Sequence, residues 1–435
     1  MGDFTVGLIG VAAFLVLMAL RTPISIAMGI TGFAGYAYLV SPNAAFRLVI
    51  QDIFTNFSNY SLSIIPLFVW MGFIAFHSGL GSKLYTFAYN LIGHWPGGLA
   101  IASQVACAVF GAICGSNTAT AATMGSIAVP EMKKYKYDAS LSTASVASAG
   151  ALGILIPPSV IFVVYGIATG QPISRLFMAG IIPGILLMTF YIITIYIITL
   201  RDPSLGPAGT KKNFKEIAAS FSQGLPEIFA VFILSIGGLF KGWFTPSEAG
   251  AVGAGGILLV NLIRGNLSWR AFNLSLIDTT RTTAMIMFLV AGAVIFGRFM
   301  AVARIPFELA NWVSALALPA YMVMALVIFI YLVLGMFIDA LALVLLTIPI
   351  FYPVVVDTLG YDPIWFGVII VMIVALGVIT PPVGMNVYII KGVVPDIPLE
   401  TIFRGVWPFV IALLLCIALL IAFPQLILFL PNLLS

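Results

Sequence analysis

The chain carries the same interrupted pattern twice, once in each half and each time inside a long apolar segment. A glycine followed by a double proline occurs at Gly153–Pro158 and again at Gly377–Pro382, and a polar break precedes each one, at Gly115–Thr118 and at Gly335–Asp339. Proline lacks a backbone donor and clashes with the preceding helical turn, so each double proline interrupts a helix. Interrupted hydrophobic segments in corresponding positions of two halves are the best sequence indication of a secondary transporter's binding site.

The composition restricts the class of protein. Of the 435 residues, 62% are hydrophobic and only 8% are charged, whereas a soluble domain has about 25% charged residues. The chain cannot cover a water-facing surface, and we predict an all-α polytopic membrane protein embedded in the lipid bilayer. The segment Phe4–Leu20 lacks a basic leader and a small-residue cleavage site, so we expect a span there rather than a cleaved signal peptide.

Several other classes lack support in the sequence. Cys107, Cys114 and Cys416 lie in apolar segments and are interpreted as buried, and no cysteine or histidine spacing suggests a metal site. The chain has no phosphate-binding loop and no His-Glu-x-x-His motif, and no basic patch with interleaved aromatic residues that would bind nucleic acid. We therefore expect no organic cofactor and no enzymatic activity. A channel remains an alternative, although two opposed broken hairpins suit alternating access better.

Apolar segments and polar breaks divide the chain into six units. Segments beside the breaks are shorter than the ~20 residues that cross a bilayer, which indicates half-helices or re-entrant hairpin arms. The predicted units are N-terminal scaffold helices with a surface arm at 1–60, a first repeat at 61–200 with a hairpin at 97–134 and a broken helix at 142–169, a cytoplasmic linker at 201–224, scaffold helices with a surface arm at 225–282, a second repeat at 283–423 with a hairpin at 320–356 and a broken helix at 364–394, and a C-terminal tail at 424–435.

Two further features concern the surface and the orientation. The segments Ala44–Ser58 and Leu267–Thr280 mix apolar and polar residues at helical spacing, so we expect two amphipathic helices at the membrane surface. Basic residues in the loop after the first hairpin and in the linker favour a cytoplasmic position for both. Alternating spans then make the first hairpin open inward and the second outward, which is the arrangement of inverted-topology repeats.

The tip of the first hairpin carries candidate ligands for an ion. Ser116, Asn117 and Thr118 supply hydroxyl and amide oxygens, and a turn inside the bilayer also frees backbone carbonyls. Such oxygens suit a hard cation such as Na⁺, and a helix that begins at the tip offers N–H groups to an anionic substrate. The alternative is a polar tip that only caps its helices.

The second half offers a matching set. Thr380, Met385 and Asn386 flank the second double proline, and Ser159 lies beside the first. We expect one ion site per half, each formed by a hairpin tip and a broken helix. A simple helix kink is the alternative for each double proline.

Three charged residues have more than one interpretation. An acid within the membrane is costly, and Asp339 could counter a cation, relay a proton or cap the returning arm. Arg298 could bind a substrate carboxylate or extend to the outer headgroups. Glu248 opens a helix after Thr245, which favours a capping box.

These motifs together resemble the large membrane subunit of tripartite ATP-independent periplasmic (TRAP) transporters, over nearly the whole chain. The resemblance rests on Gly115–Ala119, both double prolines, Thr245–Ala249 and Gly335–Asp339, in this order and spacing. It implies an elevator-type transporter of the ion-transporter superfamily in the bacterial inner membrane. It also implies two partners, which are a separate small four-helix membrane subunit and a periplasmic substrate-binding protein.

The resemblance further implies sodium-coupled uptake of organic acids such as C4-dicarboxylates or sialic acids. Carried over by position, one sodium site contains Ser116, Asn117, Gly153 and Pro157. The other contains Gly335, Gly377, Thr380 and Met385, and we add Asp339 to the sodium residues. The candidate substrate residues are Ser116, Asn117, Thr118, Thr380, Asn386 and Arg298. A stand-alone Na⁺- or H⁺-coupled anion carrier of the same superfamily is the alternative function.

Overall fold

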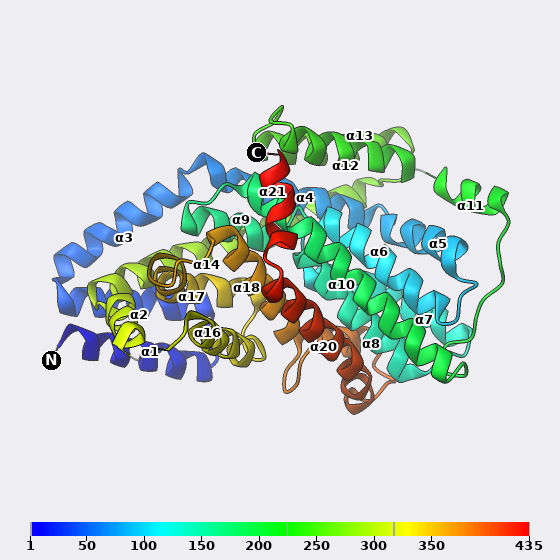
Figure 1. Ribbon diagram of the computed structural model, residues 1–435. Helices are drawn as coiled ribbons and strands as arrows, with labels where there is room; N and C mark the ends of the chain where they lie inside the picture. The colour runs from blue at the N-terminus through cyan, green and yellow to red at the C-terminus, as the bar shows by residue number, and fades with distance from the viewer. Residues whose placement is uncertain (1, 224, 316–317, 435) are drawn as a thin grey trace.

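The computed structural model describes residues 2–223, 225–315 and 318–434, and within them the chain forms 21 α-helices and no β-strand (Figure 1). The all-α prediction is confirmed. The predicted unit boundaries at positions 224 and 435 lie outside the described residues.

The first half contains ten helices. These are α1 (Asp3–Ala19), α2 (Ile24–Leu39), α3 (Pro42–Phe57), α4 (Ile64–His77), α5 (Leu80–Ile92), α6 (Gly98–Cys114), α7 (Asn117–Lys134), α8 (Ala139–Gly150), α9 (Val160–Thr169) and α10 (Ile173–Arg201). Short 3-10 turns occur at Tyr60–Ser63 and Ala151–Ile154.

The second half contains the other eleven helices within the described ranges. These are α11 (Phe214–Phe221), α12 (Leu225–Phe240), α13 (Pro246–Ile263), α14 (Trp269–Val302), α15 (Ile305–Ala315), α16 (Ala320–Gly335), α17 (Ala340–Tyr352), α18 (Pro363–Gly377), α19 (Met385–Val393), α20 (Leu399–Ala422) and α21 (Gln425–Leu434). A π-helical turn at Pro353–Thr358 extends α17.

Helix length separates the spans from the broken elements. Among the described residues, six helical stretches are long and apolar enough to cross a membrane, which are Tyr60–His77, Ile173–Arg201, Pro246–Ile263, Trp269–Val302, Ala340–Thr358 and Leu399–Ala422. The outgoing arms of both hairpins, α6 and α16, have 17 and 16 residues, below the ~20 that a bilayer requires. These lengths agree with the prediction of re-entrant hairpin arms, although α1 and α2 are equally short.

The two halves interlock through their hairpins. The return arm α7 of the first hairpin packs against α19, which follows the second double proline, and the return arm α17 of the second hairpin packs against α9, which follows the first. A second group of helices surrounds α14, which packs along α2 and α4, while α4 also packs against α13. Figure 1 shows α1 and α2 at the opposite end of the molecule from α7 and α8.

The expected surface arm at Leu267–Thr280 is not a separate element. It is continuous with the span that follows, and both form the 34-residue helix α14. Ser268 caps its start by accepting a hydrogen bond from the Ala271 N–H at 3.2 Å. No glycine or proline interrupts the chain from Trp269 to Ala291, so nothing in the local sequence ends the helix at the polar-to-apolar change. The other expected arm is α3, a separate helix capped by Ser41.

Candidate functional site at the hairpin tips

The tip of the first hairpin is a sharp turn between α6 and α7. Gly115 ends α6 with φ of 64°, in the left-handed region that favours glycine. The Ser116 hydroxyl then caps α7 by accepting a hydrogen bond from the Ala119 N–H at 3.4 Å, and it lies 3.0 Å from the Thr118 hydroxyl. The capping interpretation is therefore realised, and it leaves oxygen lone pairs of both hydroxyls at the tip.

The tip of the second hairpin has a carboxylate in the equivalent position. Asp339 caps α17, because its Oδ1 accepts hydrogen bonds from the N–H groups of Leu341 at 3.0 Å and Ala342 at 3.4 Å. A carboxylate at a helix N-terminus is favoured by the helix dipole. Both of these hydrogen bonds are accepted by the same oxygen, Oδ1.

Both broken helices are interrupted at a cis proline pair. The peptide bonds Pro157-Pro158 and Pro381-Pro382 are both cis. In the first half α8 passes through a 3-10 turn before α9 begins, and in the second half α18 ends at Gly377 and α19 begins at Met385. Each half therefore presents a stretch of non-helical backbone beside its hairpin, where carbonyl groups are free of helical partners.

A pair of glycines joins each hairpin to its own broken helix. A Cβ atom on Gly111 would lie 2.6 Å from Gly153 Cα, and a Cβ atom on Gly377 would lie 2.6 Å from the carbonyl carbon of Gly335. Contacts this short exclude any side chain. The two glycines of each pair are equally far apart in the sequence. The two halves therefore share this close backbone contact as well as the double-proline motif.

The two tips meet at one cavity of about 430 Å³. Ser116, Asn117 and Thr118 line it from the first tip, and Asp339 lines it from the second. The remaining wall is mostly apolar and includes Phe73 of α4. A small set of convergent polar groups in an otherwise apolar cavity is typical of a site for a small ligand.

The other predicted sodium residues do not line this cavity. Gly153 lies against the first tip, because a Cβ atom there would be 2.8 Å from the Ser116 carbonyl oxygen. In the second break the Thr380 hydroxyl donates to the Leu376 carbonyl at 2.6 Å. The residues predicted for the second sodium site, Gly335, Gly377, Thr380 and Met385, cluster at this break.

Arg298 lies away from the tips. Its Nε and one terminal nitrogen each lie 3.3 Å from a carboxylate oxygen of Asp52 on α3. It is sixteen residues from Thr282, which lines the cavity, and this corresponds to about 24 Å along a helix. The structure thus gives this predicted substrate residue a carboxylate partner within the chain, and α14 joins α3 through it.

Thr282 is a cavity residue that the sequence did not single out. It lies on α14 together with Met285 and Ile286, which also line the cavity. The available signal was the run of hydroxyl and basic residues from Thr279 to Thr283. This run lies where the segment changes from amphipathic to apolar, at the expected boundary between two elements.

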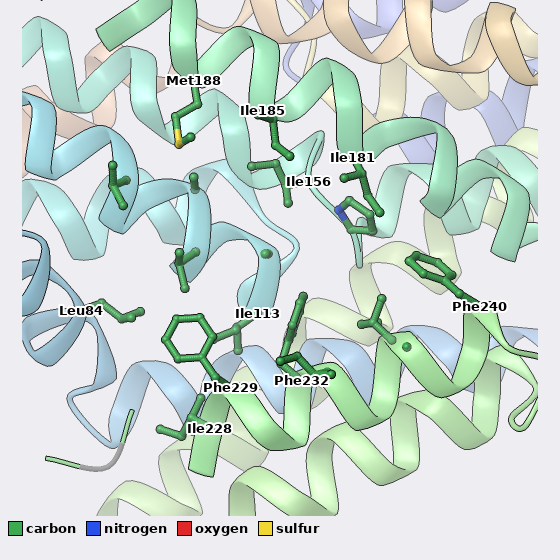
Figure 2. Close-up of a pocket in the computed structure, with 18 residues that line it drawn as sticks. Leu84, Ile113, Ile156, Ile181, Ile185, Met188, Ile228, Phe229, Phe232 and Phe240 are labelled. Carbon is green, nitrogen blue, oxygen red and sulfur yellow. The ribbon is translucent and has the colours of Figure 1, made fainter. Parts of the chain in front are cut away.

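A second cavity of about 450 Å³ lies between α12 and the helices α5, α6 and α10 (Figure 2). Its labelled lining residues, from Leu84 and Ile228 at one end to Phe240 at the other, are all apolar. Pro157, predicted to line the first sodium site, contributes to this wall instead. A cavity without polar groups cannot compensate the desolvation of an ion or a carboxylate, so the cavity at the tips is the candidate site.

Comparison with known proteins agrees with the resemblance. The family described as "Tripartite ATP-independent periplasmic transporter, DctM component" matches residues 11–426. The C4-dicarboxylate TRAP transporter large permease protein of Pseudomonas aeruginosa is 36% identical over 399 residues, which cover 91% of each chain. The sialic acid TRAP transporter large permease protein of Vibrio cholerae is 32% identical and covers 92% of this chain and 93% of that protein.

Solved structures agree on the fold. The YdaH transporter of Alcanivorax borkumensis superposes with a TM-score of 0.67 at 15% identity and covers 97% of this chain and 99% of that one. Neisseria gonorrhoeae MtrF superposes with a TM-score of 0.61 at 14% identity. Because the family matches nearly the whole length, the chain belongs to the DctM component of the tripartite ATP-independent periplasmic transporters, and it is a multi-pass transporter permease of the bacterial inner membrane and not an enzyme.

Proposed function

We propose that this chain is the large permease subunit of a sodium-coupled transporter that takes up an organic acid delivered by a periplasmic binding protein. The observation that carries the proposal is the single cavity shared by the two hairpin tips. Hydroxyl and amide oxygens enter it from one tip and a carboxylate from the other, and α7 and α17 begin at these tips.

The proposed substrate class is a small carboxylate. Relatives are named for C4-dicarboxylate, sialic acid and 2,3-diketo-L-gulonate, which are carboxylates, and one is named for the sulfonate isethionate. The N-terminus of a helix binds anions through free N–H groups and the helix dipole. The first turn of α7, which begins at Asn117, supplies such groups beside the cavity.

Sodium would offset the repulsion between two negative charges in this cavity. A carboxylate substrate would enter a largely apolar space that already contains the Asp339 carboxylate, and burial of unpaired charges is costly. Sodium ions held by the tip oxygens and by the non-helical backbone would neutralise this charge, and such backbone is where transporters commonly hold their ions. Sodium binding would thus precede and favour substrate binding.

Transport would occur by an elevator movement. The cross-packing of α7 on α19 and of α17 on α9 makes both hairpins and both broken helices one body, which supports movement as a unit. The helices around α14 would form the stationary frame, and the small four-helix membrane subunit would extend it. The movement would carry the cavity between the two sides of the membrane.

Uptake of radiolabelled organic acids into proteoliposomes tests the proposal. The large subunit is compared alone, with its small partner, and with both the small partner and the binding protein, each with and without an inward sodium gradient. We expect uptake only in the complete system with sodium. Uptake that is unchanged without sodium would contradict the coupling, and strong uptake by the large subunit alone would instead establish a stand-alone carrier.

A further inference from the structure

Asn386 occupies a position that links three elements. It lies on the first turn of α19, is fully buried, and uses both polar atoms of its side chain within the protein. Its Nδ2 donates to the Ala147 carbonyl of α8 at 3.0 Å, and its Oδ1 accepts from Asn117 Nδ2 at 3.1 Å. Its backbone N–H donates to the Val378 carbonyl at 2.9 Å, across the second break.

The contact fixes the orientation of the Asn117 amide. Because Asn117 Nδ2 is directed at Asn386, the Asn117 Oδ1 points away from Asn386, at the other edge of the planar amide group. Asn117 lines the cavity, and within the described residues its Oδ1 accepts no hydrogen bond. The first tip therefore keeps an amide oxygen available for a cation. Groups that orient a ligand in this way tune metal sites as strongly as many direct ligands.

The link is asymmetric between the halves. Counting from each double proline, the position equivalent to Asn386 is Phe162, a buried aromatic residue without polar atoms in its side chain. The second tip has no corresponding bond to the first break within the described ranges, since Asp339 bonds to the start of its own helix. The packing around Asn386 is close, because a Cβ atom on Gly150 of α8 would lie 3.0 Å from its Nδ2.

We propose that Asn386 is a positioning residue rather than a substrate ligand, and that it couples the two ion sites by holding the Asn117 amide oxygen toward the first. This deepens and rests on the proposed sodium coupling. Sodium at the second break would order Val378 to Asn386, and the ordered Asn386 would orient Asn117 at the first tip. Binding at one site would then favour binding at the other.

The test is the sodium dependence of uptake by the complete transporter carrying Asn386→Ala or Asn386→Asp. Asn386→Ala removes the acceptor for Asn117, so we expect the half-saturating sodium concentration to rise about tenfold, the size of effect that loss of a buried hydrogen bond produces. We also expect the Hill coefficient for sodium to fall toward one, with the substrate KM unchanged at saturating sodium. Asn386→Asp keeps the acceptor for Asn117 but loses the donor to the Ala147 carbonyl, so it should lose less sodium affinity than Asn386→Ala.

The matched control is Asn261→Ala. Asn261 is another buried asparagine, but it bonds to the Ile257 carbonyl of its own helix α13. It should leave the sodium parameters unchanged even if it lowers the amount of folded protein. Sodium-dependent protection against thermal unfolding of the purified complex gives the same comparison without transport, and Asn386→Ala should weaken it.

Three outcomes would overturn the positioning role. These are a wild-type sodium affinity and Hill coefficient in Asn386→Ala, an equal loss in Asn386→Ala and Asn386→Asp, or an equal loss in Asn261→Ala. A raised substrate KM at saturating sodium would instead make Asn386 a substrate ligand. Sodium-independent uptake by the unmodified transporter would contradict the proposed function itself, and the positioning role with it.

Discussion

Gly153 lies directly behind the first hairpin tip, so close that a Cβ atom there would be 2.8 Å from the Ser116 carbonyl oxygen. The same atom would lie 2.7 Å from the Thr120 hydroxyl, which donates to that carbonyl at 2.7 Å. The Ser116 carbonyl oxygen, which is predicted to bind sodium, can therefore keep its position only because Gly153 on the broken helix has no side chain. In the second half the broken helix meets its hairpin one turn earlier, where Gly377 packs against Gly335.

Gly153→Ala should displace the Ser116 carbonyl and reduce sodium affinity. An added methyl group in a closely packed site costs about 1–3 kcal/mol, which corresponds to a five- to 150-fold higher half-saturating sodium concentration if it falls on the ion site. The measurement is sodium-dependent uptake, with Gly255→Ala on α13 as the control because no atom lies within 4 Å of its added Cβ. Unchanged sodium affinity in Gly153→Ala would contradict the placement of an ion at this tip.

Asp339→Asn separates a role in countering a cation from a role in capping α17. Asparagine is as good an N-cap as aspartate, so the helix should stay capped while the negative charge is lost. If the charge counters sodium, the half-saturating sodium concentration should rise about tenfold, as for loss of one charged hydrogen-bond partner. The readout is a sodium titration of uptake at saturating substrate.

The control for Asp339 is Asp362→Asn. Asp362 caps α18 in the same way, by accepting from the N–H groups of Ile364 at 2.8 Å and Trp365 at 2.9 Å, and it does not line the cavity of the tips. It should leave sodium affinity unchanged. If Asp339→Asn also behaves like the wild type while Asp339→Ala loses stability, Asp339 is only a cap.

Arg298 and Asp52 should behave as one interaction. Arg298→Gln and Asp52→Asn are each expected to loosen the contact between α14 and α3 by a similar small amount, because a partly exposed ion pair contributes about 1 kcal/mol or less. The substrate KM should not change in either variant. A double-mutant cycle on the thermal stability of the purified complex measures the coupling.

A change in the substrate KM would give Arg298 a different role. If Arg298→Gln raises the substrate KM strongly while Asp52→Asn does not, Arg298 binds the substrate carboxylate in another state of the transporter and the pair with Asp52 is secondary. The exchange Asp52→Arg with Arg298→Asp should restore stability if the pair is the main role.

Thr282→Val should change substrate recognition without affecting sodium. The substitution keeps the side-chain shape and removes the hydroxyl from the α14 wall of the cavity, so a bound carboxylate loses one donor. We expect the substrate KM to rise several-fold, in line with about 1 kcal/mol for one hydrogen bond, at an unchanged half-saturating sodium concentration. Thr280→Val is the control, since the exposed Thr280 hydroxyl donates to Leu276 of its own helix. Equal effects of the two substitutions would exclude a contact between Thr282 and the substrate.

Local sequence signals predicted the individual elements well. Gly115 with Ser116 marked a turn and a helix start, the double prolines marked the breaks, and Thr245 with Glu248 forms the expected capping box at the start of α13. These are effects of single residues on their own backbone, so they can be read without knowing the neighbours. The local signal is misleading at α14, where a change of polarity predicts a break although no residue in it ends the helix.

The sequence alone determined that this is an α-helical membrane transporter with one broken hairpin unit in each half, because hydrophobicity, proline and glycine act locally. Only the tertiary structure decided which residues meet. It paired Asn117 with Asn386 across 269 positions, gave Arg298 a partner on α3, and brought Thr282 to the cavity. These contacts depend on how the interlocked halves and α14 pack, and packing of distant segments leaves no periodic or local signature in a single sequence.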